Sequence, residues 1–257
     1  MAARLEDALV VANELIAAGV YRLVIHAPQM AAAAQPGQFV HLKVNNLTAP
    51  LLRRPISIAN ADRSSGTIEL IYRIVGGGTA YLSGVPAGVH LDCLGPLGKG
   101  FVLDCERPLL IGGGMGLAPL VYLAQALCPR PTTVLMGGRT KDELFWEEVF
   151  RPVCDQLQLT TDDGTAGTKG YTVDVLPELL RTGHFDRIYT CGPRPMMEQV
   201  ARLASQYAIA CQVSLEEFMA CGLGGCLACS CAGADGRRRK VCTEGPVFEA
   251  GEVFSGC

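Results

Sequence analysis

The stretch RPLLIGGGMGLAPLVYLAQAL, residues 107–127, decides the fold class of this chain. A short apolar run is followed by a glycine-rich turn and then by a longer apolar segment. This order predicts a buried strand, a tight turn and a helix. Since the residues before it show no such pattern, we expect an α/β region to begin near residue 101.

The residues that follow repeat the alternation of strand and helix. Buried strands are predicted for TTVLMGGR (132–139) and LQLTTDDG (157–164), and a helix for KDELFWEEVF (141–150). DRIYTCGPRPMMEQVARLASQ (186–206) adds a further strand, turn and helix, with Pro195 in the first helical turn. The pattern predicts a parallel sheet covered by helices over residues 101–214.

The first hundred residues instead contain short β-rich runs separated by turn residues. The runs are 20–28, 37–44, 55–60, 67–75 and 89–97. Within 67–75, Ile68, Leu70, Tyr72 and Ile74 alternate and are expected on one face. We predict an antiparallel β-barrel domain over residues 1–100.

Composition narrows the class of protein. The chain has 257 residues, 49% of them hydrophobic and 18% charged, with a formal net charge of −3. This balance predicts a globular protein and gives no indication of nucleic-acid binding. The N-terminus lacks the pattern of a signal peptide, and no apolar run reaches the ~18 residues of a membrane span, so we expect a cytoplasmic protein without a membrane partner.

The segment CGLGGCLACSCAGADGRRRKVC, residues 221–242, holds five of the twelve cysteines. Disulfides are rare in the cytosol, so metal binding or catalysis is the first interpretation of this cluster. Cys221, Cys226, Cys229 and Cys242 follow the spacing C-x4-C-x2-C-x12-C, which is that of plant-type [2Fe–2S] ligands. The interspersed glycines allow the backbone to approach the sulfides. We predict a small [2Fe–2S] domain over residues 215–257.

Zinc and unligated thiols are the two alternatives to a cluster. A zinc site usually pairs two short-spaced knuckles, whereas this segment has one C-x2-C and no histidine follows His184. Buried unligated thiols are disfavoured by the polar, glycine-rich surroundings. Cys231 is expected to face away from the metal, Cys257 has no assigned role, and GRRRK (236–240) is interpreted as a solvated hairpin tip.

Two turns mark a possible nicotinamide site. GGGMGLAP (112–119) follows a strand and opens a helix, as a phosphate-binding turn requires. The segment departs from the dinucleotide-binding pattern G-x-G-x-x-G, and no acidic residue stands at the end of the next strand. A tight structural turn is therefore the alternative to a phosphate-binding turn. The second turn lies at another strand end. The candidate residues are Gly112, Gly113, Gly114 and Gly116 in the first turn and Cys191, Gly192 and Pro193 in the second.

The flavin candidates lie in the barrel region. Arg54-Pro55-Ile56-Ser57 offers a cation and a hydroxyl suited to a pyrophosphate and a ring edge. IYRIVGGGT (71–79) adds Arg73 and a glycine turn that ends in Thr79. By chemistry alone these are also ordinary strand and turn residues.

Taken together, R-P-I-S, G-x-G-x-x-P and C-G-P resemble the ferredoxin–NADP reductase superfamily. The tail EEFMACGLGGCLACSC with KVCTEGPVF resembles the electron-transfer subunits of bacterial class 1B dihydroorotate dehydrogenases. That resemblance implies FAD, NAD and a [2Fe–2S] cluster on the four cysteines. It implies FAD contacts at Arg54, Pro55, Ile56, Ser57, Ile71, Tyr72, Arg73, Gly78 and Thr79.

The resemblance also implies a partner, the FMN-containing catalytic subunit that oxidises dihydroorotate in pyrimidine synthesis. Two copies of each subunit would form a heterotetramer, and electrons would pass from FMN through the cluster and FAD to NAD⁺. No acid–base catalyst is expected in this chain, since that group would lie on the partner. NAD is favoured by resemblance, although Arg139 and Lys141 could meet a 2′-phosphate.

Two other functions stay open. One is an FAD and [2Fe–2S] reductase subunit that serves another acceptor, such as ferredoxin or sulfur compounds. The other is a nucleotide-binding regulator whose tail is held by zinc and which has no redox chemistry.

Overall fold

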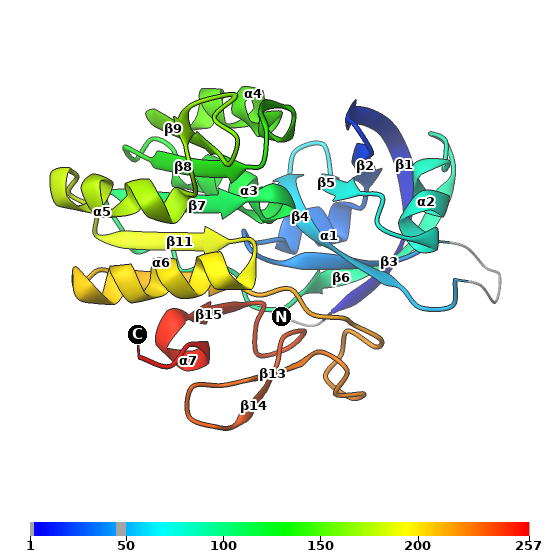
Figure 1. Cartoon of the computed structure of the whole chain (residues 1–257). Coiled ribbons are helices and arrows are strands. Elements are labelled where there is room, and N and C mark those ends of the chain that lie inside the picture. Colours follow the sequence, from blue (N-terminus) through cyan, green and yellow to red (C-terminus); the bar gives the residue numbers. More distant parts are fainter. Residues whose placement is uncertain (1–2, 45–49, 257) are drawn as a thin grey trace.

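A computed structural model describes residues 3–44 and 50–256 of the chain. Figure 1 shows a barrel, a sheet flanked by helices, and an irregular C-terminal segment that lies below both. The sequence prediction of a barrel joined to an α/β sheet and a small C-terminal segment is confirmed. Cys257 lies outside the described residues.

The barrel is closed and antiparallel, with the strand order β1-β2-β5-β4-β3-β6. Its strands are β1 (Arg4–Ala17), β2 (Val20–His26), β3 (Phe39–Lys43), β4 (Arg54–Asp62), β5 (Thr67–Arg73) and β6 (His90–Leu97). Helices α1 (Pro28–Ala33) and α2 (Gly77–Ser83) occupy two of its connections. Closure pairs β1 with β6 and so leaves no free strand edge in the barrel.

Two features of the barrel differ from the sequence prediction. Strand β1 was not predicted, because register shifts between Val10 and Ala12 and between Leu15 and Ala17 interrupt the two-residue alternation. Ile74 was expected on the same face as Leu70 and Tyr72 but lies beyond the end of β5 and is exposed. Ile71 is the buried residue instead, on the opposite face of β5 from Leu70 and Tyr72.

The second sheet has the strand order β10-β9-β8-β7-β11-β12-β15 and is parallel except for β15. Its strands are β7 (Pro108–Gly113), β8 (Thr133–Gly138), β9 (Gln156–Thr161), β10 (Thr168–Lys169), β11 (Arg187–Cys191), β12 (Ala210–Ser214) and β15 (Val247–Glu249). The helices are α3 (Leu117–Leu127), α4 (Trp146–Phe150), α5 (Thr172–Thr182) and α6 (Arg194–Gln206), with 3-10 turns η1 (Gly114–Gly116), η2 (Lys141–Leu144) and η3 (Arg151–Val153). All of β7 is buried, as its uninterrupted apolar run predicts.

The C-terminal segment is attached to this sheet. Strands β13 (Ser230–Ala232) and β14 (Arg238–Lys240) form a hairpin, so the end of GRRRK is a strand and only its beginning is a turn. Strand β15 pairs with β12, and α7 (Ala250–Val253) follows it. The division at residues 100 and 214 stays a prediction, and β15 is the element that crosses it.

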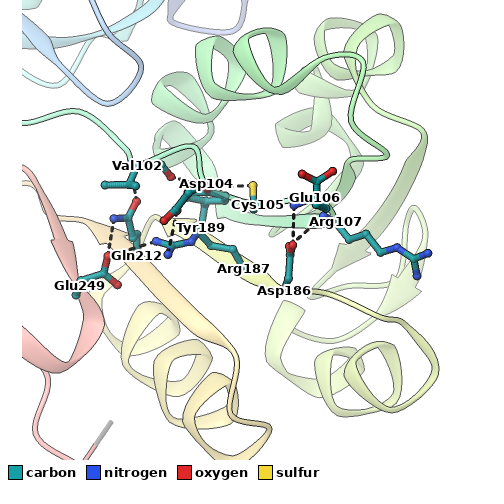
Figure 2. A network of polar contacts seen from close by, with 10 residues as sticks. All are labelled: Val102, Asp104, Cys105, Glu106, Arg107, Asp186, Arg187, Tyr189, Gln212 and Glu249. Carbon is teal, nitrogen blue, oxygen red and sulfur yellow. Dashed lines mark hydrogen bonds and ion pairs between the residues drawn. The ribbon is translucent and has the colours of Figure 1, made fainter.

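A network of polar contacts fastens the connection between barrel and sheet, as Figure 2 shows. The carboxylate of Asp186 accepts the backbone N–H groups of Glu106 and Arg107 at 2.6 and 3.0 Å. The Tyr189 hydroxyl donates to the Val102 carbonyl at 2.7 Å. These contacts join residues 102–107, which lead from the barrel into β7, to β11 and the residue before it, so they fix the connection without occupying the carboxyl edge of the sheet.

No helix in the described ranges 3–44 and 50–256 is long and apolar enough to cross a membrane.

Candidate functional site

A cavity of about 500 Å³ lies at the carboxyl ends of β7, β8, β9 and β11. This is the edge at which open parallel sheets bind ligands. Gly113, Gly114 and Pro193 line it, and Arg73 reaches it from the barrel. The buried Thr160 hydroxyl also lines it and has no hydrogen-bond partner among the described residues. The cavity therefore offers a polar ligand both glycine-turn backbone and an unsatisfied hydroxyl.

The structure brings together the two glycine turns that the sequence singled out. A Cβ atom on Gly116 would lie 2.5 Å from the backbone carbonyl of Cys191 and from the nitrogen of Gly192, so only glycine fits there. Gly114 adopts the left-handed region with φ of +58°. Gly112 packs against Leu117 and does not line the cavity.

The helices α3 and α6 begin at this edge, directly after the two turns. Neither helix has an acidic residue in its first turn, so the positive end of each helix dipole is not neutralised by its own side chains. Such ends favour phosphate groups. The Cys191 side chain is buried behind this surface, and burial raises the pKa of its thiol well above the usual value. It is accordingly a neutral thiol and not a reactive thiolate.

A carboxylate that the sequence prediction missed stands at the end of β8. Glu143, in η2, folds back and accepts hydrogen bonds from the Arg139 backbone nitrogen at 2.9 Å and from Nε at 2.8 Å. These hydrogen bonds lower the pKa of the Glu143 carboxyl. The sequence prediction of no acidic group here was wrong, because a 3-10 turn returns a residue from beyond the strand to its end.

Two of the flavin candidates meet where β4 and α2 begin. The Arg54 guanidinium crosses the start of α2, where a Cβ on Gly78 would lie 2.1 Å from Arg54 Nε. The Thr79 hydroxyl accepts the Val75 backbone N–H at 2.9 Å and holds this turn. The buried Nε of Arg73 has no hydrogen-bond partner among the described residues. Gly78 lets the Arg54 guanidinium lie against the backbone, and Arg73 has a nitrogen without a protein partner among the described residues. Two such arginines fit a pyrophosphate.

The remaining flavin candidates divide between two faces. The side chains of Pro55 and Ser57 are half-buried, on the opposite side of β4 from the buried Ile56. Ile71 packs in the cluster of apolar residues that includes α3. Tyr72 lies in the barrel core, where its hydroxyl donates to Asn13 at 3.1 Å and burial raises its pKa to about 12. Tyr72 and Ile56 therefore present only their backbone to a ligand.

Replacing Gly78 by alanine is expected to weaken FAD binding about 10- to 100-fold, because the new methyl group displaces the guanidinium of Arg54 and removes a charge-assisted hydrogen bond. Titration of the apoprotein with FAD, followed by flavin fluorescence, measures the effect. The matched control is Gly77→Ala, since a Cβ on Gly77 meets nothing within 4 Å. Equal affinities of the two variants would contradict this role of Arg54.

The four predicted metal ligands approach each other as two pairs. The Leu223 backbone N–H donates to Cys221 Sγ at 3.3 Å and, together with the neighbouring Cys226, lowers the pKa of Cys221 to about 6. The Cys242 backbone N–H donates to Cys229 Sγ at 3.4 Å. Burial, and after it the proximity of Cys229, raises the pKa of Cys242 to about 11.

This arrangement distinguishes the possible metals. Within residues 3–44 and 50–256, no three Cys, His, Asp or Glu side chains are grouped to hold one metal ion. A [2Fe–2S] cluster takes two thiolates on each of two irons, whereas a zinc ion takes all four ligands at one point. Positive φ angles at Gly222 and Gly224 shape the loop that joins Cys221 to Cys226 within the first pair. The cysteines fit the two-iron cluster better than zinc. Cys231 is buried in the same apolar cluster as Cys229 and Cys242, and its expected orientation away from the metal stays a prediction.

Comparison with known proteins agrees with these sites. Residues 7–101 match the model of the oxidoreductase FAD-binding domain. Residues 216–254 match that of the iron–sulfur cluster binding domain of dihydroorotate dehydrogenase B. The chain therefore carries an FAD-binding and an iron–sulfur-binding region.

Full-length similarity extends this result. The dihydroorotate dehydrogenase B (NAD(+)) electron transfer subunits of Bacillus caldolyticus and Geobacillus kaustophilus are each 42% identical over 256 residues, covering 96% of this chain and 98% of theirs. A solved structure of an NADH-dependent reduced ferredoxin–NADP oxidoreductase aligns with a TM-score of 0.86 and 32% identity, covering 96% of this chain and 90% of that one. The chain belongs to the family of dihydroorotate dehydrogenase B electron transfer subunits.

Proposed function

We propose that this chain transfers electrons between NAD⁺ and an FMN-containing dihydroorotate dehydrogenase subunit, in a heterotetramer of two copies of each. The observation that carries the proposal is the position of the cysteine loop. One side of it packs on the barrel, where Gly222 contacts His41 of β3, while its outer side is open. We place the complex in the cytoplasm, as expected for a segment that needs free thiols.

The outer side of the cysteine loop carries exposed apolar side chains, which support the proposal of a protein partner. Phe218 is 93% exposed, and Leu223 and Leu227 are 57% and 61% exposed. Large apolar side chains gathered around one loop indicate a surface that another protein covers. We call these three residues the loop patch. A catalytic subunit that docks there would bring its flavin to the cluster without approaching the nucleotide cavity.

The residues of this chain bind and orient, and none acts as an acid or base. Bound FAD would exchange a hydride, which carries two electrons, with NAD⁺, and a bound [2Fe–2S] cluster would pass one electron at a time. Together the two cofactors would convert two-electron transfer into one-electron transfer. Arg54 and Thr79 would hold FAD against the barrel, and the glycine turns after β7 and β11 would hold the dinucleotide. Arg73 lies between the barrel and the cavity and would serve both.

Glu143 supports NAD over NADP, because it holds the guanidinium of Arg139 that would otherwise meet a 2′-phosphate. Glu143→Gln should raise kcat/KM for NADPH relative to NADH by about 10-fold, the equivalent of roughly 1.4 kcal/mol. Steady-state rates with a dye acceptor measure this ratio. Glu147→Gln, which removes a carboxylate paired with Arg151 outside the cavity, is the control. An unchanged ratio in both variants would rule out this role for Glu143.

Co-purification with an FMN-type dihydroorotate dehydrogenase subunit tests the proposal. The mixture should form a complex and reduce NAD⁺ with dihydroorotate. Neither subunit alone should catalyse this reaction. Leu227→Asp in the loop patch should weaken the complex but leave NADH–dye activity intact. No complex and no activity would overturn the proposal.

A second candidate function is a reductase subunit that serves another acceptor, such as ferredoxin. It is favoured by the near full-length likeness to the reduced ferredoxin–NADP oxidoreductase structure. The same preparation distinguishes the two. Reduction of ferredoxin by NADH, together with no response to the dihydroorotate dehydrogenase subunit, would favour this second function.

A further inference from the structure

His41 of β3 lies at the junction between the flavin-binding barrel and the cysteine loop. On one side, β3 pairs with β4, and His41 stands opposite Pro55 of the candidate flavin-binding run. On the other side its ring contacts Gly222, where a Cβ would lie 2.7 Å from His41 Nδ1. Gly222 directly follows the cluster ligand Cys221. One imidazole therefore separates the flavin strand from the cluster loop.

Both ring nitrogens of His41 are buried and have no hydrogen-bond partner among the described residues. Its side chain is fully buried, with 0% exposure. The nearby Arg53 donates to the His41 carbonyl oxygen and to Asp92, not to the ring. Buried polar atoms without a partner are rare, and such an atom often marks the place of an unseen ligand. Simple packing would be satisfied by an apolar residue, such as the neighbouring Leu97 that also contacts the Gly222 position.

An imidazole carries at least one N–H donor in either of its protonation states.

We propose that His41 is a positioning residue for the iron–sulfur cluster, whose imidazole N–H donates a hydrogen bond to a sulfur atom on the Cys221 side. The inference rests on the proposed assignment of Cys221 as a ligand. Hydrogen bonds to the sulfurs are one of the ways in which a protein sets the reduction potential of such a cluster. A donor at this place stabilises the additional negative charge of the reduced cluster and so raises the potential. Because His41 belongs to the strand that pairs with the flavin run, the donor would come from the barrel side of the cysteine loop.

The test uses the complete FAD- and iron-loaded chain and compares His41→Leu with His41→Gln. Leucine removes the donor, and glutamine keeps an N–H group. The midpoint potential of the cluster, measured by redox titration and electron paramagnetic resonance, should shift to a more negative value in His41→Leu and return toward the wild-type value in His41→Gln. His90→Leu is the matched control, since His90 is exposed and pairs with Asp7 on the outside of the barrel.

A second measurement reports on the hydrogen bond itself. In protein labelled with 15N-histidine, pulsed electron paramagnetic resonance should show a weak coupling between a histidine nitrogen and the reduced cluster. This coupling should be absent in His41→Leu and present in His90→Leu. An unchanged potential in His41→Leu, at full iron and flavin content, would overturn the proposal. If His41→Leu fails to take up iron, absence of the nitrogen coupling in labelled wild-type protein would overturn it equally. A wild-type chain with flavin but no cluster signal would contradict the proposed function itself.

Discussion

Replacing Cys226 by serine should remove the iron–sulfur cluster and lower dihydroorotate-dependent NAD⁺ reduction at least about 100-fold, while NADH oxidation by a dye persists. Cys226 is exposed on the loop and pairs with Cys221, so the change removes one ligand without opening a core cavity. The FAD candidates and the nucleotide cavity lie on other elements and should stay intact. Iron and sulfide content, flavin content and the two activities measure the outcome.

Cys231→Ala is the matched control for this prediction. Cys231 lies on β13, five residues along the chain from Cys226, and is buried in the apolar core that also contains Cys229 and Cys242. Its replacement should leave iron and sulfide at wild-type content. If Cys226→Ser retained its cluster, or if Cys231→Ala lost it, the assignment of ligands would be wrong. Loss of FAD together with iron in Cys226→Ser would show that the tail supports the barrel.

The second large effect is expected at Gly116. Alanine there would place its methyl group 2.5 Å from the Cys191 carbonyl and the Gly192 nitrogen, which are backbone atoms that no rotamer change can move. The turn after β7 must then separate from the end of β11. We expect the free energy of unfolding to fall by about 3 kcal/mol, toward the upper end of overpacking costs. Urea unfolding followed by near-UV circular dichroism measures it.

Gly114→Ala separates the effect of space from that of backbone conformation. A Cβ on Gly114 meets no protein atom within 4 Å, but φ of +58° disfavours alanine by roughly 1 kcal/mol. The new methyl group would enter the cavity, so KM for NADH should rise although stability changes less than in Gly116→Ala. If both variants lost the same stability, contact between the two turns would not be the cause.

The sequence was sufficient for the parts of the fold that depend on local pattern. The apolar run 108–111 predicted a fully buried strand, and the glycines after it predicted a tight turn that opens a helix. The cysteine spacing predicted a [2Fe–2S] region, because spacing of ligands along one segment is a local property. In each case the residues that form the feature are close together in the chain.

The parts that could not be predicted depend on contacts between distant residues. Strand β1 is interrupted by bulges that only its partners β2 and β6 make stable. Glu143 acquires its place through a 3-10 turn that returns it to the end of β8. His41 looks like an ordinary strand residue until Gly222, 181 positions later, lies against it. No periodic pattern in the sequence indicates that these distant residues come into contact.

The attachment of β15 to β12 has a consequence for the newly made protein. The two strands pair over Gln212–Ser214 and Val247–Glu249, and β15 covers an edge of the sheet that the preceding residues have already formed. A small glycine-rich segment depends on its metal to fold, so a chain made under iron starvation would leave that edge uncovered. An uncovered edge recruits strands from other chains. We therefore expect the aggregated fraction of this protein in the cell to rise when iron is scarce.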